Sequence, residues 1–561
     1  SALLTGSAFV YTTAVPAPFM SGGDHIGPAA ISRTAWALYL QDTFKINDRF
    51  VLDYGLRYEI YTPITERAKR TAGFLMNGTQ QEYVVNPQPG YRTQWAEVVP
   101  RVQLDWRVKD TLHIHAGAGI TTIPPNSWQD NYLTGAVPYV IYPHVTPTAG
   151  KPLPYGFQIT SAELPAVYTP SGQNVYASGK TKTVAPNTVL DIERYQKDLA
   201  ALTPGSQVTP LNLAAIDRRF GNAYMQTWTL GAEEQFGKLT ADAAYVGTAS
   251  VRLPRVAYIN GYSGAGPGYA PYTQFDSSGN VIGGFGTEQM VAATAHSSYH
   301  SLQTSLSGTV PHDGPGVQVS YTWSKSIDDT SGVAGGGNST GATSNTEPQN
   351  PFDNHPEKGP SGFDVTHSFT MSLAQDLQLE KIEKLRPVNR KFTAGWELLS
   401  ISSISSGLPF TVFSGVQQTA AGSNGADRPD QIGKPHLSTA RKARQDYFGQ
   451  GANNAEYFSI PINLPGGTGP NQGYFGTLGR NTFRGPAYYD FDFSLIKDTG
   501  VGTRAGGGEL FDVQFRSEFF NLFNVVNMGL PANTIRGLGF GEISKTAGTS
   551  RQIQFSLKLL F

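Results

Sequence analysis

Two histidines one residue apart are the side chains of this sequence best placed to bind a metal ion. In the segment HIHAG, His113 and His115 alternate with Ile114 and Ala116. If the segment is a β-strand, both imidazoles lie on one face, roughly 7 Å apart along it. A zinc site needs at least three protein ligands, and no third ligand stands out. We therefore interpret the pair as ordinary polar residues of a strand, with metal binding as the weaker hypothesis.

Three further segments contain residue types that occur in ligand sites. The segment GGGNSTG at 335–341 is rich in glycine, but no lysine follows its last glycine as a phosphate-binding loop requires. The acidic segments IDDTSG (327–332) and FDNHPEKGPSGFD (352–364) could offer carboxylates to Ca²⁺, although neither has the spacing of an EF-hand loop. We interpret all three as solvated loops, with phosphate or calcium binding as the weaker hypothesis.

The sequence contains no pattern typical of a nucleophilic enzyme. It has no cysteine, which excludes a disulfide, a thiolate metal site and a cysteine nucleophile, and it has no GxSxG segment. We predict that the protein is not an enzyme and has no catalytic residue, no cofactor and no dedicated metal site. Its formal net charge of -1 gives no reason to expect nucleic acid as a partner.

The composition narrows the fold class to a β-protein. Charged residues make up 15% of the chain, compared with about 25% in a typical soluble domain. The 63 glycines, 27 tyrosines and 30 phenylalanines suit strands with aromatic anchors and many loops. No run of about 18 apolar residues occurs, so the sequence predicts no transmembrane helix. Two classes remain: a large soluble β-protein and a transmembrane β-barrel.

Apolar and polar residues alternate in segments of roughly 9–11 residues, the length of a tilted membrane-crossing strand. In VQVSYTWS, for example, Val317, Val319, Tyr321 and Trp323 share one face. We predict thirteen such antiparallel strands, with ends placed to within roughly 2–4 residues. They cover residues 34–45, 48–61, 96–108, 111–121, 223–236, 238–249, 298–310, 316–326, 365–376, 391–405, 486–497, 509–521 and 550–561. A two-sheet sandwich would show the same alternation.

The connections between these strands distinguish a barrel from a sandwich. Short turns, such as those at 46–49 and 236–238, alternate with long segments rich in Gly, Pro and Asn. The long segments cover residues 62–95, 122–222, 250–297, 327–364 and 406–485. Outer-membrane barrels have short turns on the periplasmic side and long loops outside. We therefore predict that the long segments are extracellular and that residues 1–33 belong to another extracellular loop.

Charged side chains are predicted to line the inside of this barrel. The residues are Asp490, Asp492, Asp512, Arg516 and Glu518. A hairpin of 486–497 and 509–521 with its turn near residue 503 would place Asp490 opposite Arg516 and Asp492 opposite Gln514. Such opposed charges contribute roughly 0.2–1 kcal/mol to a strand pair, which favours a structural role. Alternatively these groups hold a plug or line a transport path, and reversing the charge of Arg516 would then alter uptake without altering folding.

The odd number of strands predicts that the barrel is larger than this chain. A bacterial single-chain barrel has an even number of strands and closes on itself. An open edge in lipid would leave backbone groups unpaired, each at a cost of several kcal/mol. If the last strand descends to the periplasm, the first strand descends too, which places Ser1 outside the cell. We expect the missing strands to come from an upstream segment of the same protein or from a companion chain.

Several segments, in this order along the chain, resemble the C-terminal barrel of Oar-like TonB-dependent outer-membrane receptors. They are NAYMQTWTLGAEEQFGKLTADAAYVGTAS (222–250), SYHSLQTSLSGTV (298–310), VQVSYTWSKSIDD (317–329), FDVTHSFTMSLAQDL (363–377), GWELLSISSISSGLPFTV (395–412), RGPAYYDFDFSL (484–495), FRSEFFNLFNVVN (515–527) and RQIQFSLKLLF (551–561). The resemblance implies a 22-stranded barrel closed by an N-terminal plug. Residues 34–561 would form its C-terminal part, while the plug, a TonB box and the first strands would lie outside this chain.

The resemblance also implies a function and a set of partners. It implies a receptor in the outer membrane of a Gram-negative bacterium, which captures a ligand with its outer loops and imports it. The implied partners are membrane lipid, the upstream plug and strands, the TonB complex acting through the N-terminal region, and the barrel-assembly machinery. That machinery would recognise the alternating last strand through Phe555, Leu557, Leu559 and Phe561. Two alternatives stay open: a surface interaction or structural protein without transport, and a passive porin.

Overall fold

The three-dimensional structure is a computed structural model. It describes residues 11–12, 15–16, 30–77, 80–88, 90–135, 137–141, 144–147, 158–176, 184–202, 206–208, 213–260, 273–275, 281–284, 288–332, 348–351, 353–415, 427–437, 445–449, 456–461, 475–503 and 509–560. None of the helices in these ranges is both long enough and apolar enough to cross a membrane.

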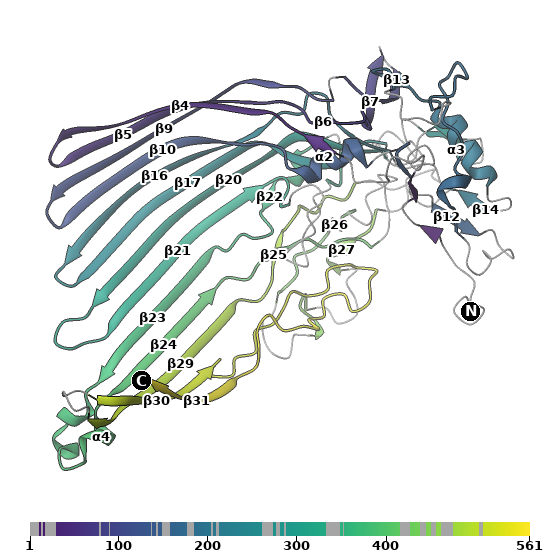
Figure 1. The fold of residues 1–561 in the computed structure, drawn as a ribbon. Helices are drawn as coiled ribbons and strands as arrows, with labels where there is room; N and C mark the ends of the chain where they lie inside the picture. Colours follow the sequence, from purple (N-terminus) through teal and green to yellow (C-terminus); the bar gives the residue numbers. More distant parts are fainter. Residues whose placement is uncertain are drawn as a thin grey trace.

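An antiparallel path of thirteen strands dominates the described part of the chain (Figure 1). The strands follow one another in chain order, so each is hydrogen-bonded to the next one along the path. They are β4 (Ala35–Asn47), β5 (Phe50–Tyr61), β9 (Gln94–Lys109), β10 (Leu112–Ile123), β16 (Ala223–Phe236), β17 (Leu239–Tyr258), β20 (Glu288–Thr309), β21 (Gly316–Asp328), β23 (His367–Leu377), β24 (Trp396–Ser405), β29 (Tyr488–Thr503), β30 (Glu509–Phe520) and β31 (Gln552–Leu560). Each predicted strand overlaps one of these, and the all-β antiparallel fold class is confirmed.

The pairing register gives this sheet one apolar face and one polar face. Directly opposed residues share a face, and the register opposes Tyr245 to Leu302 and Phe515 to Leu557. We call the face that carries these residues the apolar face and the opposite one the polar face. Large side chains on the apolar face stay exposed, with 58% of Leu230 and 69% of Leu557 accessible. They are therefore not packed against a second sheet, as a sandwich would require, and they suit contact with hydrocarbon.

The two ends of the sheet differ in their connections. At one end, here the turn end, β4–β5, β9–β10 and β16–β17 close through residues 48–49, 110–111 and 237–238. At the other, the loop end, long segments carry most of the remaining elements, as the right side of Figure 1 shows. In outer-membrane barrels the end with long connections is extracellular. The alternation of short and long connections follows the sequence prediction.

One connection at the turn end is longer than the others. Between β23 and β24 lie η4 (Leu379–Lys381), η5 (Glu383–Leu385) and α4 (Arg390–Thr393). The side chain of Asn389 accepts a hydrogen bond from the backbone N–H of Lys391 and caps α4. Strand β24 consequently begins at Trp396, five residues after the predicted start at 391.

Strands β17 and β20 extend beyond their predicted ends. β17 continues to Tyr258 and β20 begins at Glu288, so the connection predicted at 250–297 is shortened to 259–287. The register shifts between Ser250 and Pro254, where a bulge interrupts the alternation that the sequence prediction relied on. Beyond the bulge, burial of apolar side chains stabilises the pairing of the two strands, and Val291 is fully buried there.

The outer segments predicted as loops contain secondary structure of their own. Two short strands extend the large sheet: β15 (Leu213–Ile216) runs parallel to β20, and β22 (Gly359–Pro360) pairs with β21. The other short elements are β1 (Tyr11–Thr12), β2 (Val15–Pro16), β3 (Ile31–Ser32), β6 (Thr65–Glu66), α2 (Ser127–Thr134), β11 (Val140–Ile141), β12 (His144–Pro147), η2 (Ser161–Glu163), β14 (Ser206–Val208), β18 (Thr273–Phe275), β19 (Val281–Gly284), η3 (His355–Glu357), β25 (Pro409–Phe410), β26 (Asp430–Gln431), β27 (Phe458–Ser459) and β28 (Phe483–Arg484).

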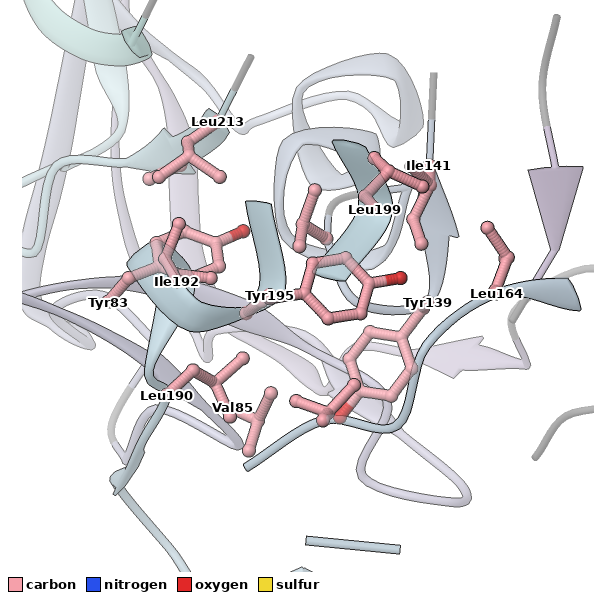
Figure 2. Packing of buried hydrophobic residues seen from close by; sticks show 14 of the residues in the cluster. Tyr83, Val85, Tyr139, Ile141, Leu164, Leu190, Ile192, Tyr195, Leu199 and Leu213 are labelled. Atoms are coloured by element: carbon pink, nitrogen blue, oxygen red, sulfur yellow. The ribbon is translucent and has the colours of Figure 1, made fainter. Parts of the chain in front are cut away.

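The described parts of the segments 62–95 and 122–222 pack together around a shared core, here the outer core (Figure 2). It is built from β7 (Ala72–Asn77), β8 (Gln80–Val85), β13 (Thr188–Val189), α3 (Ile192–Ala201) and their neighbours. Asp191 caps α3 by accepting from the backbone N–H of Arg194 at 3.0 Å. Ile192, Tyr195 and Leu199, at helical spacing, are all buried. These segments therefore form a packed unit at the loop end.

The segment 406–485 has a second core, made largely of aromatic rings. Phe448 stacks on Phe540 with ring centroids 4.9 Å apart and meets Phe458 and Phe483 edge to face. The hydroxyl of Tyr447 donates to the carbonyl of Arg484 at 2.6 Å, and burial raises the pKa of Tyr447 to about 12. This aromatic core ties the segment to the chain between β30 and β31.

We predict that Leu199→Ala loosens the outer core without unfolding the large sheet. Deleting a fully buried leucine side chain typically costs about 2–5 kcal/mol, and Leu199 has no exposed surface. Hydrogen exchange of the amides of α3 should therefore speed up. Leu202→Ala is the matched control, because Leu202 follows the same helix and is 37% exposed. Equal exchange in both variants would contradict this account of the packing.

Candidate functional site

The charged residues predicted to line the barrel lie together on the polar face of β29 and β30. Their directly opposed partners are Ser403 for Asp490, Ile401 for Asp492, Gly500 for Asp512, Ile496 for Arg516 and Ser494 for Glu518. The register places all five side chains on the same face, so the structure brings them together on one side of the sheet.

The predicted pairing of Asp490 with Arg516 is wrong. Arg516 lies opposite Ile496, and Gln514 lies opposite Asp498 in place of Asp492. The reason is the position of the turn: β29 continues to Thr503 and β30 begins at Glu509, so the hairpin is centred between them. Moving the centre of a hairpin by three residues moves every cross-strand partner by six. The charges share a face but do not form the expected ion pair.

Asp492 has a structural contact that the sequence did not reveal. Its Oδ1 accepts a hydrogen bond from the backbone N–H of Asn521 at 2.9 Å, just beyond the end of β30. The Asn521 side chain in turn accepts from the N–H of Val525 and donates to the carbonyl of Thr549. Asp492 thereby fixes the chain that leaves β30 toward the last strand.

The two histidines of HIHAG lie on the polar face of β10. His113 is opposite Arg107 on one side and Glu233 on the other, and His115 is opposite Asp105 and Gly231. A side-chain carbon added to Gly231 would come within 2.4 Å of Nε2 of His115, so the imidazole lies over this glycine. No group of three histidine or acidic side chains suited to a metal ion occurs within the described ranges.

The polar face forms a trough beside these histidines. Its volume is about 910 Å³, and it is lined by residues of β4, β5, β9, β10 and β16. The polar lining includes Gln41, Asp53, Arg57, Glu59, Arg101, Gln103 and His115. Charges of both signs and amides line it, which suits contact with water or a polar surface, and the polar residues named here include no nucleophile paired with a base.

Arginines at the loop end bind the carboxylates of the two acidic segments. Arg428 donates to both carboxylate oxygens of Glu357, at 2.8 and 2.9 Å, and the two side chains are 3% and 1% exposed. Arg480 pairs with Asp328 in equally deep burial. Arg484 pairs with Asp364, whose side chain is fully buried. A bidentate, buried arginine–carboxylate pair holds its two segments in a defined geometry.

These three pairs, here the rim arginine pairs, join distant parts of the chain. The acids come from the end of β21 and from the segment before β23, and the arginines come from 427–484. Arg480 also donates to the carbonyl of Glu357 at 2.8 Å, and Arg428 to that of Leu478. Three of the carboxylates considered for Ca²⁺, those of Asp328, Glu357 and Asp364, therefore have guanidinium partners. The other two, Asp329 and Asp353, lie beside His296 and His355. The segment GGGNSTG lies outside the described residues.

A further buried pair fixes the start of the first strand of the sheet. Nη2 of Arg33 donates to Asp130 at 2.8 Å and to the hydroxyl of Tyr91 at 2.9 Å. Burial raises the pKa of Asp130, and Arg33 opposes that shift. The pKa of Tyr91 is raised to about 12, mainly by burial and to a smaller extent by the negative charge of Asp130. The phenol therefore keeps its proton and donates to the carboxylate across the physiological range.

Three of the four predicted assembly residues are described, and they lie where the alternation placed them. Phe555 and Leu557 are 66% and 69% exposed on the apolar face, and Leu559 is 51% exposed. The Phe555 ring stacks on Phe515 of β30 with centroids 6.2 Å apart. Phe561 lies outside the described residues. Their role in assembly stays a prediction.

Sequence reasoning missed the rim arginine pairs. Arg428 lies in NGADRPD, and Arg480 and Arg484 lie in GRNTFRG, segments with few apolar residues that were interpreted as loops. The available signal was the scarcity of charge, at 15% of the chain. In such a sequence, arginines within Gly- and Pro-rich segments are candidates for burial beside an acid.

Comparison with known sequences identifies a family. Residues 20–554 match the family described as "Outer membrane beta barrel domain". Comparison with curated proteins gives no match.

Comparison with solved structures gives transporters of the outer membrane. The outer membrane transporter YddB from Escherichia coli aligns over 94% of this chain and 54% of that chain, with 9% identity and a TM-score of 0.37. The FrpB iron transporter from Neisseria meningitidis aligns over 94% and 45%, with 11% identity and a TM-score of 0.38. The ferripyoverdine receptor of the outer membrane of Pseudomonas aeruginosa aligns over 94% and 38%, with 10% identity and a TM-score of 0.40. This chain spans about half the length of these proteins or less.

We predict that Arg428→Met unfolds the rim locally. The change leaves Glu357 buried without its partner, which typically costs about 3–5 kcal/mol. Proteolysis and hydrogen exchange should increase at 349–357 and 475–484. The control is Lys381→Met at the turn end, which removes a cation from an exposed pair with Asp313 and should leave exchange unchanged. Unchanged exchange at the rim in Arg428→Met would refute its structural role.

We predict that cysteines at 496 and 516 form a disulfide across β29 and β30. Directly opposed strand residues have Cα atoms about 4.5–5.5 Å apart, within the range that a disulfide spans. The chain has no cysteine of its own. Oxidation of Ile496→Cys with Arg516→Cys should give a reducible cross-link, seen as a loss of two free thiols. The pair Asp490→Cys with Arg516→Cys should give none, and the reverse result would restore the sequence-based register.

Proposed function

The chain belongs to the outer membrane beta-barrel domain family. We propose that it forms part of the barrel wall and the extracellular opening, here the mouth, of a receptor that imports a ligand. The protein lies in the outer membrane of a Gram-negative bacterium. The thirteen strands form part of the barrel wall, with the apolar face toward lipid and the polar face toward an aqueous interior. The segments at the loop end supply the mouth, where the ligand is captured.

The observation that carries this proposal is the fixed geometry of the mouth. The rim arginine pairs bind the segments 327–364 and 406–485 to each other at the ends of the strands. Pre-ordered loops lose less conformational entropy when they bind a ligand, which suits a receptor. The trough on the polar face lies along the wall below this end of β4 to β16 and offers a polar surface to a plug or a passing solute.

We also propose the energy coupling and the receptor subtype that the sequence resemblance implies. The receptor is TonB-dependent and Oar-like, and its plug and first strands are supplied upstream or by a companion chain. Within the described residues the end strands β4 and β31 are not paired with each other, which leaves both edges available for such strands. Residues 1–33 contribute to an outer loop, and residues 34–561 form the C-terminal part of the barrel.

A second candidate is a surface protein that binds a macromolecule and transports nothing. The observation that favours it is the outer core, since segments 62–95 and 122–222 form a packed unit large enough to present a binding surface. A passive porin is the third candidate, because a polar interior alone would conduct small solutes.

Two measurements on the full-length protein in detergent and in liposomes separate these candidates. The first is binding of the purified periplasmic domain of TonB to the protein, followed by calorimetry. The second is swelling of the liposomes in raffinose, which reports an open pore. We expect TonB to bind and the liposomes not to swell, since a plug closes the barrel.

An absence of TonB binding rejects the proposal, and the swelling result then identifies the alternative. Rapid swelling without TonB binding would identify a porin. Neither swelling nor TonB binding would identify a surface protein. The variant Arg428→Met should keep TonB binding, because the rim arginine pairs lie at the opposite end of the strands from the periplasmic turns.

A further inference from the structure

The apolar face carries a compact group of polar and cationic side chains on the strands from β16 to β23. We call this group the outer-face patch. It consists of Trp228 in β16, Tyr245 in β17, His300 in β20, Tyr321, Trp323 and Lys325 in β21, and His367 in β23. The register places them on the same face as Leu230 and Leu302. Charged and hydrogen-bonding side chains are costly on a lipid-facing surface unless a polar group contacts them.

Hydrogen bonds hold the side chain of His300 in place. The indole N–H of Trp228 donates to the hydroxyl of Tyr245 at 3.4 Å, and that hydroxyl lies 2.7 Å from Nδ1 of His300. An indole can only donate, so the Tyr245 oxygen accepts there and still has its own proton to donate. When Tyr245 donates that proton to Nδ1, the other ring nitrogen, Nε2, carries the N–H of the imidazole. The ring of Trp228 packs over Gly247, where a side-chain carbon would come within 2.3 Å of it.

The same arrangement recurs two strands further along the sheet. The hydroxyl of Tyr321 lies 2.8 Å from Nδ1 of His367. In both pairs the rings stack with centroids 6.2 Å apart and planes 21° apart. Both histidines are exposed. Two Nε2 groups are thereby presented at equivalent positions on the outer surface.

Lys325 lies between the two histidines. It is directly opposite His300, and His367 is opposite Trp323, which makes it a diagonal neighbour of Lys325 at about 7–8 Å. The ammonium lies 3.6 Å from Asp364, a carboxylate that Arg484 also binds. Two cations share one carboxylate, so Lys325, Arg484 and Asp364 together carry a net positive charge. The Lys325 side chain is 46% exposed.

The depth of the patch limits what can occupy it. Lysine on the lipid-facing side of a barrel is costly at the bilayer midplane, by about 2–4 kcal/mol, and nearly free at the interface. Lys325 lies nine residues from the turn-end start of β21 at Gly316, about the length of a membrane-crossing strand, so we infer that it lies near the outer headgroups. Below it, toward the turn end, Tyr321 and Phe369 continue the apolar face. The neighbour at this height is the headgroup of an outer-leaflet lipid.

We propose that the outer-face patch binds a phosphate group of an outer-leaflet lipid, between the Lys325 ammonium and the Nε2–H groups of His300 and His367. The phosphate supplies the negative charge that the patch lacks, and its oxygens accept the three donors. Trp323, which is 56% exposed, packs against the acyl chains or the headgroup ring. The lipid source is favoured over free phosphate because the patch lies on the apolar face, where the rest of the ligand would contact the wall.

The test uses the full-length protein in detergent, titrated with bis-phosphorylated lipid A and, separately, with its fully dephosphorylated form. Native mass spectrometry counts the bound lipid. We expect Lys325→Gln to weaken binding of the phosphorylated form by about fivefold and the double change His300→Phe with His367→Phe to weaken it by about tenfold or more. Binding of the dephosphorylated form should not change. Lys325→Arg, which keeps the charge, should keep the affinity.

The matched control is Lys109→Gln at the turn end, which also removes one cation from an exposed ion pair, here with Glu234. Folding of every variant is checked by heat-modifiable migration in gels. If Lys325→Gln does not fold, the double histidine change, which touches no ion pair, decides the question. Wild-type affinity in the folded histidine variant, equal weakening by Lys109→Gln, or full displacement of lipid A by millimolar inorganic phosphate would each overturn the proposal.

Discussion

Contact with hydrocarbon on one face of the sheet is the constraint on which this structure depends. Lipid offers no hydrogen bonds, so every backbone group of a crossing strand must pair with a neighbouring strand. The same lipid requires apolar side chains at every second position, as at Phe555, Leu557 and Leu559. These two requirements explain both the chain-order pairing of thirteen strands and the exposure of large apolar residues that a soluble protein would bury.

At the loop end the constraint changes, because the chain leaves the membrane and must order long segments in water. Few apolar runs are available there, and the structure uses two other devices. The first device is hydrophobic packing, in the aromatic core around Phe448 and in the outer core around Tyr195. The other is the set of rim arginine pairs, in which each buried carboxylate is matched by a guanidinium. Buried charges are stable only with such partners, so these pairs also specify which segments meet.

The sequence predicted the strands well and their partners less well. Alternation has a period of two residues, so it shows which face a side chain occupies but is unchanged by any even shift in register. The hairpin of β29 and β30 illustrates this: the turn was misplaced by three residues and the partners by six, yet Asp490 and Arg516 still share the polar face. The ends of β17, β20 and β24 were missed for related reasons, since a bulge and a capped helical turn interrupt the alternation locally.

The sequence by itself determined the fold class, the two faces of each strand and the alternation of short and long connections, because these depend on residues close together in the chain. Only the tertiary structure decided which side chains meet across long separations. Arg428 and Glu357 are 71 residues apart, and His300 and Lys325 become neighbours only through the register of β20 and β21. Such contacts follow from the summed pairing and burial of whole segments, and no local pattern encodes them.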